Sequence, residues 1–532
     1  VPRKVLMVYD GAEAPTRAES APHRLGVMPL EYLGYVVEYL DVREDALPQA
    51  PLGGAYAGIV TWMSDEELPR PDRYRRWLSR QIDEGIKVVV IGDFGFPSEG
   101  TLLRKLGLSR VPGAVAEPVA QVAASPMAGF EAPPQINARE MNTFHADSPD
   151  VKVHVAVEDG RGQKLALVGT APWGGFALDP YVIAEGYQGR LRWVLDPFAF
   201  YRAALGPGPG LVPDTTTENG RRLLTAHIDG DGFLNGAEIS GRPWSSQVIL
   251  ERILKVFRIP TTVSVIEGEV GPAGMYREQS PKLEAVARQI FALPNVELAS
   301  HAYSHPFDWE KAAHEKGGED IYHLPIPGYR YDVRREVAGS VEYINAHLAP
   351  PDKKVKVFLW SGEALGGEDA VAITRELGLF NVNGGNTQIT RERDSLTEVA
   401  PMGLRVGREF QVYAAVQNEN IFTNLWHGPY YGFRTVMETF ELTDRPRRLK
   451  PLCIYYHFYS GAKVASVNAL EDVYRYGLEK QESLPVWLSD FARKVEEFQT
   501  ASLARLPDGG FQVRGMRALR TLRERGSPVS KA

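Results

Sequence analysis

The chain has 532 residues, of which 44% are hydrophobic and 24% are charged, and its formal net charge is −7. At ~150 residues per domain, this length predicts two or three domains whose cores need no disulfide bonds. The mild acidity, without a basic patch containing interleaved aromatic residues, excludes nucleic acid as an expected partner.

The chain contains a single cysteine, Cys453. One cysteine excludes a disulfide framework and a cysteine-rich zinc site. No run of ~18 consecutive apolar residues indicates a membrane-spanning helix, so we expect a protein that does not span the membrane. Because the chain begins at Val1 and shows no signal peptide, we expect a soluble fragment of a longer protein.

The first third of the chain alternates strand-like and helical patterns, and the sequence becomes β-rich from about residue 111. This alternation predicts a Rossmann- or flavodoxin-like parallel α/β domain over residues 1–212. No glycine-rich phosphate loop follows the first predicted strand, and this part of the chain has no cysteine. We therefore expect no nucleotide cofactor, no cysteine-dependent amidotransferase activity and a non-catalytic role in packing or partner binding.

A segment rich in glycine and proline, residues 206–220, predicts a domain boundary. The α/β alternation then resumes over residues 221–500, which predicts a barrel-like domain whose strand ends gather side chains at one face. Residues 501–532 begin like a strand and then stop. We expect them to be the start of a truncated C-terminal domain, or a tail.

Two motifs in the second domain have residue types that bind metal ions. Asp229 and Asp231 follow a predicted strand in HIDGDG, and His301 and His305 end the segment VELASHAYSH. Each motif alone is more often a turn or an incidental pair. The spacing of four residues puts two imidazoles on one side of a helical turn. Together, two histidines and one carboxylate match a catalytic zinc set with one open position.

A third residue, His457, ends the strand-like segment CIYYH. Alone, it would be explained as a half-buried core histidine. Because strand ends of such a domain meet at one face, it could instead act as an acid on the opposite side of the same site.

The order of these motifs resembles the polysaccharide deacetylases of carbohydrate esterase family 4, and with the upstream α/β domain it resembles in particular the deacetylases of the bacterial Pel exopolysaccharide. The resemblance covers nearly the whole chain. It implies a distorted (β/α) barrel with one divalent metal ion, zinc by preference. Asp231, His301 and His305 would hold the metal, with Asp229 as catalytic base and His457 as acid.

The same resemblance implies metal-dependent N-deacetylation of N-acetylhexosamine units during modification and export of a biofilm polysaccharide. It places the protein in the periplasm, with the N-acetylated polysaccharide as substrate and export-complex proteins as further partners. Two alternatives stay open: a scaffold or carbohydrate-binding part of a secretion complex with a weak or inactive site, and metal-dependent C–N hydrolysis of a small molecule.

Two departures from the family pattern affect the base. Gly230 separates aspartates that are usually adjacent, so Asp229 and Asp231 could exchange their roles. The arginine that usually orients the base is missing from the segment FLWSGEALGG. Glu363, or an arginine from another loop such as Arg393, could take its place.

Aromatic residues near these motifs could stack on sugar rings, although most aromatic residues are core residues. We expect WHGPYYGF, residues 426–433, to be a substrate loop because it is too polar and broken for a buried strand. His427 in this loop is the rival to His457 as the acid. The predicted substrate-binding residues are Trp360, Tyr303, His427 and Tyr430.

Overall fold

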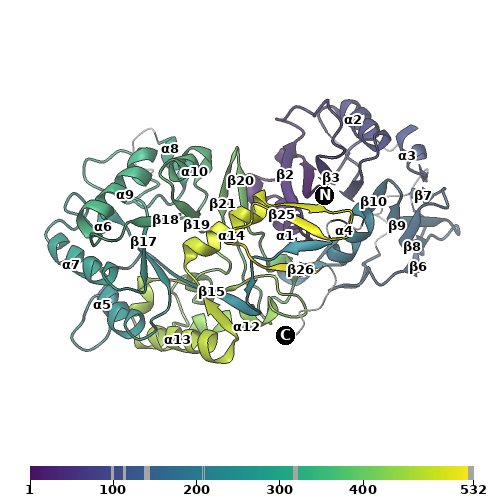
Figure 1. Ribbon diagram of the computed structural model, residues 1–532. Helices are drawn as coiled ribbons and strands as arrows, with labels where there is room; N and C mark the ends of the chain where they lie inside the picture. Colours follow the sequence, from purple (N-terminus) through teal and green to yellow (C-terminus); the bar gives the residue numbers. More distant parts are fainter. Residues whose placement is uncertain are drawn as a thin grey trace.

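The structure is a computed structural model that describes residues 1–66, 68–97, 101–111, 115–136, 144–206, 208, 210–315 and 321–524. Two sheets organise it, one in the N-terminal lobe and one in the larger second lobe (Figure 1). Both lobes combine helices with parallel strands, so the prediction of an α/β protein is confirmed. No helix in the described ranges is both long enough and apolar enough to cross a membrane.

The N-terminal sheet has eight strands and is mixed. Its parallel part has the order β2–β1–β3–β4–β10, which is the order of flavodoxin-like sheets. The β-rich second half of the domain adds three antiparallel strands at one edge, so the sheet is only partly parallel. The strands are β1 (Lys4–Tyr9), β2 (Val36–Asp41), β3 (Tyr56–Met63), β4 (Val88–Gly92), β10 (Gly174–Leu178), β9 (Lys164–Ala171), β8 (Lys152–Glu158) and β6 (Ala120–Ala124).

Alternating residues of β1 fill two separate cores, because successive side chains of a strand point to opposite faces. Val5 and Met7 pack with helices α1 (Val27–Tyr32) and α4 (Pro197–Leu205). Leu6 and Val8 pack on the other face with α2 (Pro71–Asp83) and α3 (Thr101–Lys105). Smaller strand pairs complete this lobe: β5 (Leu108–Arg110) with β7 (Phe144–Ala146), and β11 (Ile183–Glu185) with β12 (Leu191–Trp193).

The second lobe is built on a sheet whose parallel strands run in the order β22–β15–β16–β17–β18–β19–β21. Within the described ranges no strand pairing joins β21 to β22, so the barrel is open there. Three shorter strands, β14, β20 and β23, extend the sheet. The bounds are β14 (Thr217–Glu218), β15 (Arg221–Asp229), β16 (Thr261–Val265), β17 (Val296–Ser300), β18 (Val355–Leu359), β19 (Phe380–Val382), β20 (Gly403–Val406), β21 (Glu409–Val412), β22 (Leu452–His457) and β23 (Ser483–Pro485).

Helices connect these strands and pack against them. The last one, α14 (Leu488–Thr500), contacts β15, β18, β19 and β21, and its Ser489 hydroxyl donates to Glu297 near the start of β17 at 2.5 Å. It therefore covers the amino ends of the strands and leaves their carboxyl ends to the loops. The other helices are α5 (Ser245–Ile249), α6 (Glu267–Val270), α7 (Ser280–Phe291), α8 (Trp309–Ala313), α9 (Ser340–Tyr343), α10 (Gly367–Glu376), α11 (Glu419–Phe422), α12 (Val436–Leu442) and α13 (Val464–Arg475).

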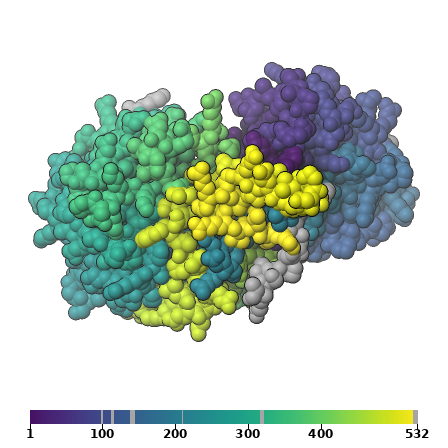
Figure 2. Space-filling model, in the orientation of Figure 1, coloured from purple at the N-terminus to yellow at the C-terminus, as the bar shows by residue number. Residues whose placement is uncertain are grey.

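The C-terminal segment lies across the junction of the two lobes, as the yellow surface in Figure 2 shows. Its hairpin consists of β24 (Ser502–Arg505) and β25 (Phe511–Arg514), and β26 (Leu522–Glu524) pairs with the linker strand β13 (Leu211–Pro213). Arg3 of the first lobe donates hydrogen bonds to the carbonyl groups of Phe498 and Ala501 at 3.0 and 2.7 Å. This segment therefore ties the lobes together.

Arg222, on β15, is a buried cation that the barrel holds by three hydrogen bonds. Its guanidinium donates to the carbonyl groups of Lys450 and Phe440 at 3.0 and 2.6 Å, and to the Thr443 hydroxyl at 2.9 Å. Burial lowers the pKa of this side chain to about 10. The interaction fixes the start of β15 against the segment that leads into β22.

We predict that Arg222→Ala lowers the free energy of unfolding by ~3 kcal/mol or more, because buried carbonyl groups lose their donors. The matched control is Arg221→Ala, which removes an exposed arginine and should stay within ~0.5 kcal/mol. Urea unfolding of the whole chain measures both. Equal small effects in the two variants would contradict the assigned role of Arg222.

Candidate metal centre and active site

The predicted site residues lie at the carboxyl ends of parallel strands. Asp229 ends β15 and His457 ends β22, and the register of this parallel pair places the two residues side by side. His301 follows the last residue of β17, which is two strands away in the same sheet. Carboxyl ends of parallel strands meet at one face, so the sheet itself brings these residues together.

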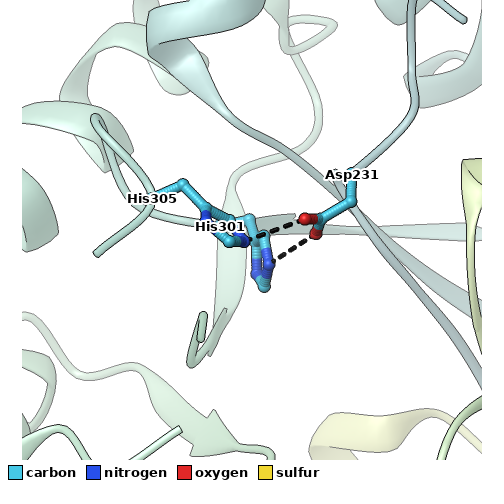
Figure 3. Close-up of side chains that lie close together, drawn as sticks. All are labelled: Asp231, His301 and His305. Carbon is cyan, nitrogen blue, oxygen red and sulfur yellow. Dashed lines mark ion pairs between the residues drawn. The ribbon is translucent and has the colours of Figure 1, made fainter. Parts of the chain in front are cut away.

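Asp231, His301 and His305 form a compact set of candidate metal ligands, and their ligand atoms all lie within 4.8 Å of one another. The Asp231 carboxylate points between the two imidazoles (Figure 3). His301 Nε2 lies 3.1 Å from one carboxylate oxygen of Asp231, and His305 Nε2 lies 2.9 Å from the other. Two imidazoles and one carboxylate suit a divalent cation such as zinc and leave a coordination position open.

The protonation of His301 supports this assignment. Its Nδ1 lies 2.9 Å from the Leu359 carbonyl oxygen, which can only accept, so Nδ1 carries the proton. Its Nε2 atom faces the buried Oδ2 atom of Asp231. Burial opposes a charge on His301, but the carboxylates of Asp229 and Asp231 outweigh burial and raise the pKa of this imidazole. The space between Nε2 and Oδ2 therefore suits a proton or a cation. Support from a backbone carbonyl is typical of metal-binding histidines.

The loop that carries the two histidines is not helical, contrary to the helical turn that the HxxxH spacing predicted. Residues 301–308 contain no helix, and Ala302 and His305 have φ angles of 68° and 52°, in the left-handed region. The buried Glu336 carboxylate holds the loop by accepting from the backbone of Tyr303 and Ser304 at 3.0 and 2.8 Å. This carboxylate therefore stabilises the loop conformation in which the two imidazoles converge.

The glycines of the HIDGDG motif allow a close approach of the backbone to its neighbours. A Cβ atom on Gly230 would lie 2.7 Å from the backbone nitrogen of Ile266. A Cβ atom on Gly232, whose φ is +77°, would lie 2.4 Å from the ring of Tyr459. The motif therefore positions Asp231 against β16 and the segment that follows β22, which an ordinary Asp-Gly turn would not require.

Asp229 is held by neutral donors. The Tyr455 hydroxyl donates to it at 2.6 Å, and the Asn383 amide donates to both carboxylate oxygens at 3.1 Å. These two donors orient the carboxylate, the role for which Glu363 or Arg393 was suggested. Glu363 instead accepts from the backbone of Trp309 at 2.7 Å, and Arg393 is an exposed residue whose guanidinium lies 3.8 Å from Glu398.

His457 faces Asp229 and Asp231, with its Nε2 atom at 3.7 and 3.9 Å from their carboxylates. On its other side, the Glu419 carboxylate lies 3.0 Å from Nδ1 and accepts from the His457 backbone at 2.9 Å. Burial opposes protonation of the imidazole, but the charge of Glu419 outweighs it and raises the pKa of His457 to about 10. His457 is therefore a cation at neutral pH.

The carboxylates of the site differ in their surroundings. Burial would raise the pKa of Asp231, but the imidazoles of His305 and His301 outweigh it and hold that pKa well below its usual value. Glu269, on α6, shows the opposite behaviour. Burial, assisted by the charge of Asp231, raises the pKa of Glu269 to about 7, and its Oε2 atom makes no hydrogen bond in the described part of the chain.

The predicted substrate-binding residues are not gathered in one place. The Trp360 ring is 1% exposed and packs edge-on against Trp309 with centroids 5.1 Å apart, so it offers no face to a sugar. Tyr303 is also buried, beneath the guanidinium of Arg335. These two placements differ from the predicted stacking role, because both rings belong to the protein interior.

The loop 426–433 does reach the surface. His427 is exposed and its Nδ1 lies 3.0 Å from the Asn424 carbonyl oxygen, while Tyr430 is half-buried under the Lys463 ammonium group. Trp426 connects the loop to the site, because its ring lies 6.0 Å from Tyr430 and 5.8 Å from Tyr459. Of the two candidate acids, only His457 lies among the ligand residues.

Sequence reasoning missed Asn383, Tyr455 and Glu419 as functional residues. Tyr455 could have been found, because it lies two residues before His457 on the same face of β22. Asn383 directly follows the last residue of β19 and belongs to the glycine-containing segment NVNGGNT. Glu419 begins a four-residue helix seven residues before the predicted substrate loop 426–433, and no pattern in the sequence links it to His457.

Comparisons with known proteins found similar structures only. No protein-family model and no curated protein sequence matches the chain. A structure titled polysaccharide deacetylase from Mycobacterium smegmatis has 14% identity and a TM-score of 0.35 over 54% of this chain and 95% of its own. A 4-alpha-glucanotransferase from Thermococcus litoralis has 11% identity and a TM-score of 0.32 over 51% of this chain and 40% of its own. A peptidoglycan N-acetylglucosamine deacetylase has 14% identity and a TM-score of 0.27 over 49% of this chain and 85% of its own. Similarities of this size do not establish a family.

We predict that His301→Ala and Asp231→Ala each lower the metal affinity by more than ~100-fold. Removing a residue that only supports a metal ligand typically costs ~10–100-fold, and the loss of a ligand should cost more. Asp229→Asn should keep the metal, because its carboxylate is engaged by Tyr455 and Asn383. Titration of the metal-free chain with Zn²⁺ or Co²⁺ measures this, with the exposed His427→Ala as control. Loss of metal in Asp229→Asn would show that the two aspartates exchange their roles.

Proposed function

We propose that the chain is a metal-dependent hydrolase that removes N-acetyl groups from hexosamine units of a polysaccharide. The observation that carries this proposal is the arrangement around Asp231. A set of two histidines and one carboxylate lies beside a separate buried carboxylate, Asp229, and opposite an imidazole, His457, that is paired with Glu419. Hydrolysis of an amide needs these three elements: a Lewis acid, a base and an acid.

The ligand set, the base and the acid have separate tasks in this proposal. A divalent cation, when bound, would polarise the amide carbonyl and lower the pKa of water from about 15.7 towards about 7. Asp229 accepts the proton of the attacking water, while Tyr455 and Asn383 keep its carboxylate in place. His457 donates its proton to the leaving amine nitrogen. Water and amide are thereby converted to acetate and a free amine.

His457 suits the acid role better than His427 does. It is protonated at neutral pH because Glu419 raises its pKa, and its Nε2 atom faces the space between Asp229 and Asp231. His427 is exposed. The positive charge on His457 also stabilises the negative charge that develops on the carbonyl oxygen.

The substrate and location follow from the resemblance of the motifs and belong to the proposal. We propose an N-acetylated exopolysaccharide of the Pel type, modified in the periplasm during export, with export-complex proteins as partners and zinc as the metal. The exposed loop around Trp426 and Tyr430, which leads from Tyr459 beside the site to the surface, supports a long substrate over a small one.

The first test is acetate release from a partially deacetylated N-acetylhexosamine polymer by the zinc-loaded chain. We predict that Asp229→Asn lowers kcat by at least ~100-fold with the metal retained, because it removes the base. The exposed Asp352→Asn is the matched control and should keep full activity. Treatment with a chelator should abolish acetate release, and zinc should restore it. A metal-loaded chain that releases no acetate would instead favour a scaffold or carbohydrate-binding role.

The ion pair with Glu419 makes a prediction about pH. Glu419→Gln removes the charge that raises the pKa of His457, so the imidazole loses its proton at lower pH. Because the acid is active only while protonated, the alkaline limit of kcat/KM should move down by at least ~1 pH unit. A pH profile of acetate release measures this. The profile of Glu479→Gln, an exposed carboxylate outside the site, should match the unmutated chain. Equal profiles for both variants would exclude His457 as the acid.

A further inference from the structure

A second cavity lies between the two lobes, apart from the candidate metal centre. Its volume is about 1620 Å³, which exceeds the ~300–1,000 Å³ of sites for single small molecules. Residues 15–19 of the first lobe form one wall, and residues 308–314, 363–370 and 398–407 of the second lobe form the other. Asp229, Asp231 and the three site histidines do not line it. We call this cavity the interlobe groove.

The interlobe groove opens on the same face as the metal centre. Its second wall is made by loops that follow β17, β18 and β19, which continue the sheet from β15 and β16 in that order. His305 is four residues before Trp309 in one wall, and Asn383, which holds Asp229, is two residues before Gly385 in another. Phe307, which directly precedes the groove residue Asp308 in the chain, has its ring 5.6 Å from the ring of His305 and is 43% exposed.

The groove walls are preformed rather than loose. His23 and Tyr413, from different lobes, both line the groove, and the His23 ring lies within hydrogen-bond distance of the hydroxyl groups of Tyr39 and Tyr413, at 2.6 and 3.0 Å. Glu31 of the first lobe accepts from the backbone of Met402 at 2.8 Å. These buried contacts hold the two walls at a fixed separation.

The groove has an excess of negative charge. Its walls carry twice as many carboxylates as lysine and arginine side chains. Lys311 is paired with Asp308 at 2.9 Å, so these two charges offset each other, whereas Arg17 donates to the Arg405 carbonyl oxygen at 2.9 Å and keeps its charge. Glu310 and Asp369 are exposed, and neither forms an ion pair within the described ranges. A clefted surface of one sign concentrates ligands of the opposite sign.

The chemistry of the proposed reaction matches this charge. Its substrate is a neutral N-acetyl group, whereas its product is an amine that is protonated at mildly acidic to neutral pH. We propose that the interlobe groove binds the amine-bearing, de-N-acetylated stretch of the polysaccharide as it leaves the metal centre. This inference rests on the proposed function and gives the first lobe a role as one wall of the product site.

The test measures binding of glucosamine hexamers and N-acetylglucosamine hexamers to the full zinc-loaded chain by isothermal titration calorimetry. The Asp229→Asn background prevents turnover. We expect the glucosamine hexamer to bind at least ~10-fold more tightly, with an affinity that falls as salt is added. The groove variant combines Glu19→Gln, Glu310→Gln and Asp369→Asn, and should weaken this binding by at least ~10-fold.

A matched control removes the same charge elsewhere. Glu44→Gln, Asp352→Asn and Glu479→Gln change exposed carboxylates outside the groove, and this control variant should bind the glucosamine hexamer within ~2-fold of the background chain. Equal weakening in the groove and control variants would overturn the proposal, because net charge alone would then explain binding. Equally tight binding of a lysine hexapeptide would overturn the assignment to an amino sugar.

The outcomes separate this inference from the proposed function. Binding is measured without turnover, and acetate release is measured on the chain with Asp229 intact. If hexamers bind in the groove but no acetate is released, the deacetylase proposal fails and the groove stands. If acetate is released and the groove variant binds the glucosamine hexamer as tightly as the background chain, the groove proposal fails and the deacetylase stands.

Discussion

The parallel pairing of β15 with β22 is the interaction on which the candidate site depends. It aligns Asp229 with His457. Two residues earlier on each strand, and therefore on the same face, it aligns His227 with Tyr455. The rings of His227 and Tyr455 stack with centroids 4.0 Å apart, and the Tyr455 hydroxyl reaches Asp229. A shift of β22 by one residue along β15 would turn Tyr455 and His457 to the outer face of the barrel. The catalytic geometry is therefore a property of the sheet.

The second constraint is electrostatic. Asp229 and Glu419 are buried close to the half-buried Asp231, and the side chains that contact these carboxylates carry imidazole, hydroxyl and amide groups. Buried charges are tolerated only when they are paired or coordinate a metal. Protonated His457 compensates one of the three carboxylates. A divalent cation beside Asp231 would compensate the other two, so the charge balance and the ligand geometry lead to the same ion.

The sequence predicts the α/β alternation of both lobes and the residues at the strand ends, because periodicity and strand termination are local properties. It does not predict which partners complete the site. Asn383 and Glu419 are 154 and 38 residues from Asp229 and His457, the residues they contact. The helical turn expected for HxxxH was wrong because Glu336, outside the motif, sets the loop conformation. Trp360 was predicted to bind substrate, whereas tertiary packing against Trp309 makes it part of the core.

The first lobe gains a physical rationale from its junction with the barrel. Part of the junction is filled with apolar side chains, where Met28 and Phe198 of the first lobe pack with Ile389, Val399 and Leu449 of the second. A domain that only stabilised the barrel would be expected to fill the whole junction in this way. Another part is instead a wide cavity with an excess of carboxylates, whose mutual repulsion costs stability. Such a cost is offset when a cationic ligand occupies the space. The reaction proposed at the neighbouring strand ends converts neutral N-acetyl groups into protonated amines, so catalysis itself would supply that ligand. The negative charge of the groove would then draw the product away from the metal centre.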